Sequence, residues 1–109
     1  MKTPDNDAKI LTLLAMSRKA GKLLLGFESV REGMERGKVF LSLVTADASE
    51  KTKKEVEFFS IKYNVPFLRA KARKEEIKRF TGREAAVMGI ADPNLANGIV
   101  SLSDYNGNT

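Results

Sequence analysis

The segment from residue 39 to residue 45 constrains the fold of this chain more than any other feature. It reads VFLSLVT, which is rich in β-branched residues and almost continuously apolar. A strand with one face in water alternates apolar and polar residues, whereas a strand covered on both faces does not. The segment therefore predicts a central strand, and such a strand needs packed layers on both sides of its sheet.

Segments with helical spacing alternate with short strand-like runs along the rest of the chain. The spacing predicts a first helix with its cap at Asp5 or Asp7, a second from Phe27 to Gly37, a third from Ser49 to Asn64, a short fourth that ends at Gly82, and a last one from Asp92-Pro93. Further strands are expected at residues 23–25, 67–69 and 85–91. This alternation predicts a three-layer α/β/α sandwich. We expect one domain over residues 1–109, with frayed tails at 1–6 and 104–109.

Several classes of function are excluded or disfavoured by what the sequence lacks. Cysteine and histidine are absent, which excludes disulfides and thiol chemistry and removes the commonest general base. The chain is therefore not expected to be an enzyme, nor to hold a metal, a cofactor or a small-molecule substrate. No apolar run is long enough to cross a membrane, and residues 1–7 do not resemble a signal peptide. We expect a cytoplasmic monomer.

Positive charge is concentrated in one segment. The formal net charge is +5, and residues 69–83 contain seven basic and two acidic residues, so the rest of the chain is neutral. Such a local excess attracts phosphate groups through counterion release. A solubilising charged helix is the alternative explanation for the same pattern.

Gly26 precedes the second predicted helix, and its position permits two interpretations. Free amides at a helix N-terminus favour an anion such as phosphate. A turn that requires a positive φ explains the glycine equally well. Phe27 follows it and is able to stack on a base, although its spacing with Val30 and Met34 favours a core position.

Three segments taken together resemble the ribosomal protein L7Ae/L30e family, and most closely its bacterial YlxQ-like branch. The first is KAGKLLLGFESV at residues 19–30 and the second is ERGKVFLSLVTADAS at residues 35–49. The third combines YNVPF at residues 63–67 with TGREAAV at residues 81–87. The resemblance covers about residues 8 to 103. It implies an α/β/α sandwich with a central mixed sheet of about four strands.

The resemblance also implies binding to kink-turn RNA, a sharply bent helix with a bulge. In the family, a glycine-led helix enters the RNA groove with an Asn-Glu pair and a lysine, and a second loop packs on the bulged nucleotides. Carried over, the glycine is Gly26, the pair falls on Glu28 and Ser29, and the lysine falls on Glu32. The second loop falls on Gly82, Arg83, Glu84 and Ala85. Because Glu32 cannot replace a cation, Lys22, Arg31, Arg36 and Lys38 are the alternatives that would neutralise phosphates, and Lys78 adds charge from the basic fourth helix. The candidate RNA-binding residues are thus Lys22, Gly26, Phe27, Glu28, Ser29, Arg31, Arg36, Lys38, Lys78, Gly82, Arg83, Glu84 and Ala85.

Three hypotheses for the function follow. The first is a protein that binds structured RNA, such as ribosomal RNA, in connection with translation. The second is a protein-interaction module that kept the fold and lost RNA specificity, which the acidic Glu28 and Glu32 would favour. The third is an enzyme acting on RNA, for which the chain offers no room for a separate catalytic domain.

Overall fold

The computed structural model describes residues 6–107, which form five helices and four strands in alternation. The elements are α1 (Asn6–Lys19), β1 (Leu23–Leu25), α2 (Phe27–Glu35), β2 (Leu41–Val44), α3 (Glu50–Lys62), β3 (Phe67–Arg69), α4 (Lys74–Thr81), β4 (Val87–Ile90) and α5 (Pro93–Gly107). No helix among these residues is both long enough and apolar enough to span a bilayer.

The four strands form one mixed sheet in the order β1-β4-β2-β3. β4 runs antiparallel to both of its neighbours, and β2 and β3 are parallel. Every residue of β2 and β4 is buried, as expected for the two central strands. The sequence prediction of a mixed four-stranded sheet with a central strand near residues 39–45 is confirmed.

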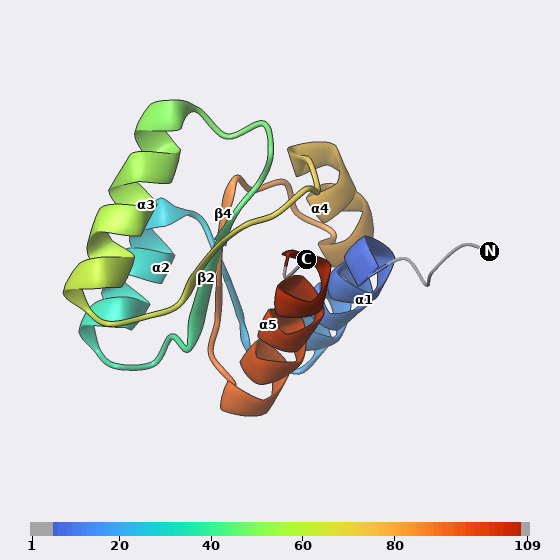
Figure 1. The fold of residues 1–109 in the computed structure, drawn as a ribbon, viewed down its shortest axis with the longest axis horizontal. Helices are drawn as coiled ribbons and strands as arrows, with labels where there is room; N and C mark the ends of the chain where they lie inside the picture. Colours follow the sequence, from blue (N-terminus) through green and yellow to red (C-terminus); the bar gives the residue numbers. More distant parts are fainter. Residues whose placement is uncertain (1–5, 108–109) are drawn as a thin grey trace.

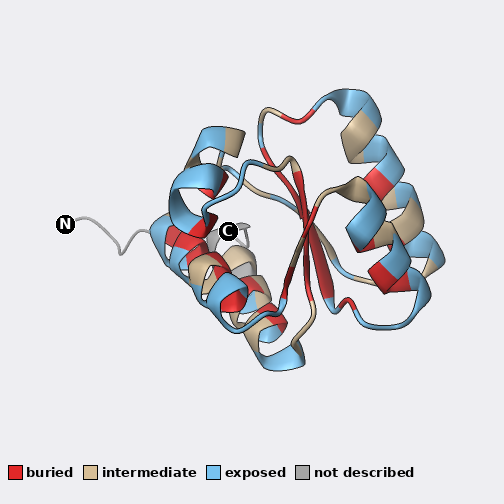
Figure 2. Cartoon of the chain, turned by 180° about the vertical axis from the view of Figure 1, so that it is seen from behind, coloured by how far each residue is buried: buried red, intermediate tan, exposed pale blue. Residues whose placement is uncertain are grey.

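Helices cover the sheet on both faces, which confirms the predicted α/β/α sandwich. Figure 1 shows α2 and α3 on one side of the sheet and α1, α4 and α5 on the other. Each side has its own apolar core, one built around Leu14, Leu43 and Ile99 and the other around Val30, Val44 and Val56. Figure 2 shows that the buried residues line the strands and the helix faces turned toward them.

Several helix ends lie where local chemistry predicts them. The Ser49 hydroxyl accepts a hydrogen bond of 3.0 Å from the Thr52 amide and caps α3, and Asp92 accepts one of 2.8 Å from the Asn94 amide at the start of α5. Asn64 has a φ of 58° just after α3. These caps confirm the predicted start of the third helix and of the last one.

Some predicted boundaries are wrong. The central strand is Leu41–Val44 and the last strand is Val87–Ile90, both shorter than their apolar runs, because apolar residues also fill the turns that flank the sheet. α1 begins at Asn6, so Asp7 lies in its first turn instead of capping it, and Asp5 is outside the described residues. α5 continues to Gly107, so residues 104–107 are helical where a tail was predicted. Of the predicted tails, residues 1–5 and 108–109 are outside the described residues.

Candidate RNA-binding surface

The tip of α2 and the loop that carries Arg83 lie at the same end of the sheet. We call this the Gly26 end, where β1, β2 and β3 finish and β4 begins. The Gly26 amide donates a 2.9 Å hydrogen bond to the carbonyl of Val87, the first residue of β4. The loop of residues 82–86 leads directly into Val87, so the two predicted parts of the site are neighbours.

Backbone hydrogen bonds join two further loops to the Gly26 end. The Thr45 amide donates to the Ala86 carbonyl at 3.0 Å, and the Ala46 amide donates to the Ala72 carbonyl at 2.8 Å. The segments after β2 and β3 are thereby attached to the loop before β4. Four connections of the sheet therefore form one continuous surface, because parallel strands and their antiparallel neighbour expose opposite chain ends on the same side.

Gly26 has a backbone conformation that only glycine adopts without strain, with φ of 101° and ψ of 150°. A Cβ atom at this position would meet nothing within 4 Å, so conformation and not crowding requires the glycine. Because glycine has no side chain, no cap hydrogen bond satisfies the first-turn amides of α2. The turn interpretation of Gly26 is confirmed, and it leaves an uncapped helix N-terminus that is suited to an anion.

The other two helices that begin at this end carry side-chain caps. Ser49 caps α3, as described above. At α4, the Glu76 carboxylate accepts from the Arg73 amide at 2.9 Å, and the Asp47 carboxylate accepts from the Lys74 amide at 3.1 Å. Among these three helix tips, only that of α2 presents uncapped amides to solvent.

The pKa of the Asp47 carboxyl is lowered, although partial burial by itself would raise it. The Thr45 hydroxyl, the Lys74 amide and the charge of Arg73 together outweigh the burial. The Thr45 hydroxyl is buried and makes no hydrogen bond of normal geometry. The 3.1 Å hydrogen bond from the Lys74 amide is therefore the better supported of the two interactions with the Asp47 carboxylate. Asp47 therefore stays ionised and ties the loop after β2 to α4.

Acidic side chains surround the single cation in the first two turns of α2. Arg31 Nη2 lies 2.7 Å from Glu28 Oε1, and Arg31 Nη1 lies 3.6 Å from Glu35 Oε1. The hydrogen bond to Glu28 is the main reason that the pKa of Arg31 is raised. Glu32 is exposed on the same helix. Arg31 is thus engaged within the protein, and this face of α2 is net acidic.

Lys78 in the last turn of α4 and Arg83 beyond its end are both exposed. Gly82 has a φ of 87° and ends the helix, as its position after Thr81 predicts. Thr81 holds the turn, since its hydroxyl lies 2.6 Å from the Ile77 carbonyl and 3.1 Å from the Arg83 carbonyl. Lys78 and Arg83 form no ion pair with any described residue. Glu84 is exposed and Ala85 is half-buried in the same loop.

The remaining predicted cations lie at the other end of the sheet, which we call the Lys22 end. The Lys22 carbonyl accepts from the Ala91 amide at 2.8 Å, where β1 begins and β4 finishes. Arg36 and Lys38 follow the C-terminal end of α2. A groove of about 630 Å³ runs between these three cations and includes Ser29 and Glu32 on its α2 side. The predicted residues therefore divide between two ends that α2 connects.

Phe27 packs into the core, as its helical spacing predicts. Its ring is half-buried and contacts Phe59 edge-to-face, with ring centroids 5.9 Å apart. A stacking contact with a base stays a prediction.

The sequence pattern did not identify Phe40 as a surface residue, because it placed Phe40 inside the predicted central strand. Phe40 precedes β2, its side chain is 41% exposed, and it lines the groove beside Lys38. Its neighbours Val39 and Leu41 are buried, so burial alternates here although the sequence is apolar throughout and gives no signal for it.

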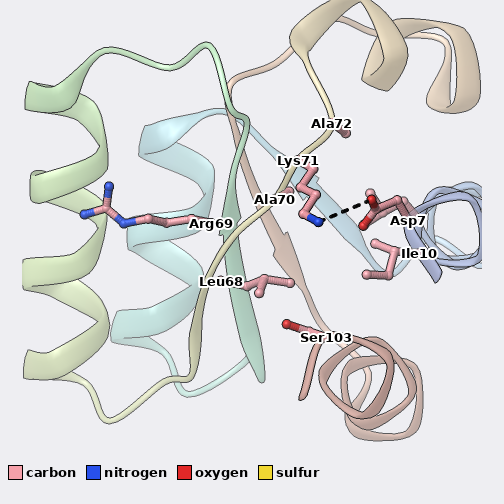
Figure 3. Close-up of a pocket in the computed structure, with 9 residues that line it drawn as sticks. Asp7, Ile10, Leu68, Arg69, Ala70, Lys71, Ala72 and Ser103 are labelled. Atoms are coloured by element: carbon pink, nitrogen blue, oxygen red, sulfur yellow. Dashed lines mark ion pairs between the residues drawn. The ribbon is translucent and has the colours of Figure 1, made fainter. Parts of the chain in front are cut away.

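One cavity lies away from both ends. It has a volume of about 210 Å³ and opens between α1, α5 and the outer edge of β3. Figure 3 shows Ile10, Leu68 and Ser103 around it, Lys71 paired with Asp7 at 4.0 Å, and Arg69 directed toward α3. None of the predicted site residues lines this cavity.

Across residues 6–107, no group of three or more acidic side chains is placed to hold a metal ion.

A family model matches most of the chain. Residues 8–97 match the ribosomal protein L7Ae/L30e/S12e/Gadd45 family. The chain belongs to this family. An RNA-binding protein YlxQ of Enterococcus faecium is 34% identical over 91 residues, which cover 84% of this chain and 87% of that protein. The RNA-binding protein YlxQ of Bacillus subtilis (strain 168) is 32% identical over 93 residues, covering 84% and 92%. These relatives place the chain in the YlxQ-like branch of the L7Ae family.

Two solved structures share the fold. A protein of unknown function from Bacillus halodurans C superposes with a TM-score of 0.84 at 30% identity, covering 89% of this chain and 98% of that one. A 15.5 kD RNA-binding protein of Giardia lamblia superposes with a TM-score of 0.75 at 16% identity, covering 96% and 90%. At this lower identity, the second likeness shows the fold of the L7Ae family alone.

The polar positions of the L7Ae pattern lie on the exposed face of α2. Glu28 and Ser29 occupy the first turn and Glu32 the second, and all three are exposed. The family pattern has Asn-Glu at the first two positions and a lysine at the third. This chain has a carboxylate at the third position, and Arg31 of the same helix is held in an ion pair. This face of α2 is therefore more acidic than the family pattern implies.

Proposed function

We propose that this protein binds structured RNA through the Gly26 end of its sheet. One observation carries the proposal: the uncapped tip of α2 is hydrogen-bonded to the strand that the loop of Arg83 leads into. Helix amides offer hydrogen-bond donors to phosphate or base edges, and Lys78 and Arg83 add charge close by. Membership of the L7Ae family and the names of the YlxQ relatives support the same function.

The proposed target is a kink-turn-like RNA. Protein side chains cannot read the deep major groove of a regular A-form helix, so specific recognition favours bends and unstacked bases. A narrow glycine-led helix tip beside a loop suits such a bend. Glu28 accepts hydrogen bonds from a guanine edge, and Ser29 contacts a base or a phosphate. Within this proposal the protein acts as a monomer on RNA of the translation machinery, such as ribosomal RNA.

A titration of two RNAs tests the proposal. Fluorescence anisotropy would compare a kink-turn RNA with a plain duplex of equal length at several salt concentrations. We expect tighter binding to the kink-turn and an affinity for both that falls with salt, by about 0.9 in log–log slope for each phosphate neutralised. Equal affinity for the two RNAs would remove the kink-turn claim. The absence of binding at low salt would remove the proposed function altogether.

The acidic face of α2 favours a second candidate, a protein-interaction module. Glu28, Glu32 and Glu35 surround Arg31 there, and such a surface repels phosphate. A pull-down with the intact protein, before and after ribonuclease treatment of the lysate, separates the two candidates. Partners lost after ribonuclease support RNA binding. The same protein partners recovered after ribonuclease, together with a failed RNA titration, favour the module.

A further inference from the structure

The groove at the Lys22 end differs in character from the surface at the Gly26 end. It lies beside β1, which is one of the two edge strands of the sheet, and its volume is about 630 Å³. Three cations, one carboxylate and one exposed aromatic ring define its chemistry, namely Lys22, Arg36, Lys38, Glu32 and Phe40. Neither the family pattern nor the tip of α2 accounts for the ring.

The cations of the groove are free to meet an anion. Lys22, Arg36 and Lys38 are exposed, and within residues 6–107 they form no ion pair. This differs from Arg31 within α2, which two glutamates engage. Glu32 is the one carboxylate that lines the groove. The groove is therefore electropositive, although the neighbouring face of α2 is acidic.

Phe40 is held in place by its backbone while its ring faces outward. Its amide donates a 2.8 Å hydrogen bond to the Ile90 carbonyl, and its neighbours Val39 and Leu41 are 5% and 1% exposed. A single exposed phenylalanine on a protein surface is unremarkable by itself. Here the ring is fixed beside Lys38 and shares its groove with Lys22 and Arg36, which is the combination that single-stranded nucleic acid requires.

We infer that this groove binds an unpaired RNA strand, with its phosphates against Lys22, Arg36 and Lys38 and one base stacked on Phe40. The inference rests on the proposed function, because the strand continues from structured RNA docked at the Gly26 end. α2 spans about 13 Å between the two ends at 1.5 Å per residue. Ser29 and Glu32 of α2 line the groove, so it starts within the first turns of that helix. A single-stranded extension follows α2 from one end of the sheet to the other.

Binding by stacking does not require side chains that form hydrogen bonds to the edges of particular bases. Stacking on an aromatic ring tolerates any base, and phosphate contacts carry no sequence information. The expected ligand is therefore a short extension of any sequence next to a structured element. A peptide partner would instead need a continuous apolar surface, whereas Phe40 is the one aromatic residue among the described residues that line this groove and three of the other lining residues are cations.

The test compares a blunt kink-turn RNA with the same RNA carrying a five-nucleotide single-stranded extension at either the 5′ or the 3′ end. One extension base is 2-aminopurine, whose fluorescence falls when it stacks. We expect one of the extensions to raise the affinity about tenfold and to lose fluorescence on binding. If both extended RNAs bind like the blunt RNA, the groove inference is overturned while the proposed function stands. If the blunt RNA does not bind, the proposed function fails.

Substitutions in the groove test whether its residues cause the gain in affinity that the single-stranded extension provides. Phe40→Ala and Phe40→Leu should bind blunt RNA as the wild type does and lose the gain from the extension. Lys22→Gln with Lys38→Gln should lose the same gain and should lower the salt dependence of extended RNA more than that of blunt RNA. Phe58→Ala is the matched control, because this phenylalanine is 61% exposed on α3 and does not line the groove. A full gain in Phe40→Ala, with circular dichroism like that of the wild type, would overturn the inference.

Discussion

Arg31 Nη2 lies 2.7 Å from Glu28 Oε1, so the one cation within α2 is held by a carboxylate in the first turn of the same helix. This pair decides how much positive charge the Gly26 end offers to RNA. A phosphate that approaches the tip has to compete with Glu28 for the guanidinium. Exposed pairs of this kind contribute little to stability, so their effect is expected in binding rather than in folding.

Glu28→Gln should release Arg31 while it keeps the shape of the side chain. We expect tighter binding to all RNAs at low salt, a salt slope steeper by about one, and a changed preference between kink-turn and duplex. Ser29→Ala should change the preference alone. Glu35→Gln is the control, because its 3.6 Å contact is longer and the Glu28 pair persists. Unchanged affinities of the Glu28 and Ser29 variants for every RNA would show that the site is not on α2.

Charge reversal at Lys78 and Arg83 should weaken binding broadly. The double variant Lys78→Glu, Arg83→Glu removes two exposed cations next to the loop before β4, so the affinity for kink-turn and duplex should fall together. The salt slope should decrease by about two, one for each lost phosphate contact. Lys9→Glu with Lys54→Glu makes the same change of charge on α1 and α3. An equal loss in that control would assign the effect to net charge instead of to the loop.

Gly33 brings α2 close to the sheet and so sets the position of the helix. A Cβ atom there would lie 2.7 Å from Leu24 Cδ1 and 2.7 Å from Val39 Cγ2. Gly33→Ala should therefore lower the free energy of unfolding by about 1 kcal/mol, because overpacking outweighs the gain in helix propensity. Gly98→Ala in α5 is the control, since its Cβ would meet Leu13 at an ordinary 3.4 Å. Urea unfolding of the two variants measures the difference, and equal stability would contradict close packing at Gly33.

The lowered pKa of Asp47 predicts a pH dependence of stability. A carboxyl whose pKa is lower in the folded state stabilises the fold above its unfolded pKa of about 3.9 and loses this effect as the pH falls through the folded value. Asp47→Asn should cost less than about 1 kcal/mol at pH 7, because Asp47 is partly exposed. Thermal unfolding should show this difference above about pH 5, and it should vanish in stronger acid. A difference that grows toward low pH would exclude the carboxylate role.

Most helices and strands could be predicted from the sequence, because the features that define them lie within a few residues of one another. Ser49 and Asp92 mark helix starts through hydrogen bonds that reach only two or three residues along the chain. The strands at residues 23–25 and 67–69 follow from short apolar runs. Phe40 was misplaced because an apolar run does not show which of its residues turns outward. That depends on the hydrogen bond that the Phe40 amide donates to the carbonyl of Ile90, fifty residues away in the chain.

In the candidate site as well, the sequence indicated individual residues, whereas the fold determined which of them lie together. Sequence spacing indicated the importance of Gly26 and of the cations in residues 69–83. It placed Lys22, Arg36 and Lys38 with Gly26, because they are near in sequence. The structure separates them, since β1 and α2 run the length of the sheet and carry the two groups to opposite ends.

The order of helices and strands, the caps and the excess of positive charge were thus determined by the sequence itself, because each depends on a residue and its near neighbours. Only the tertiary structure decided that the tip of α2 meets the loop of Arg83, that Glu28 engages Arg31, and that Phe40 joins three free cations in a groove. The first and third of these relations come from strand pairing, which joins distant segments. The second depends on which way two side chains turn on an exposed helix face, and spacing alone leaves that direction open.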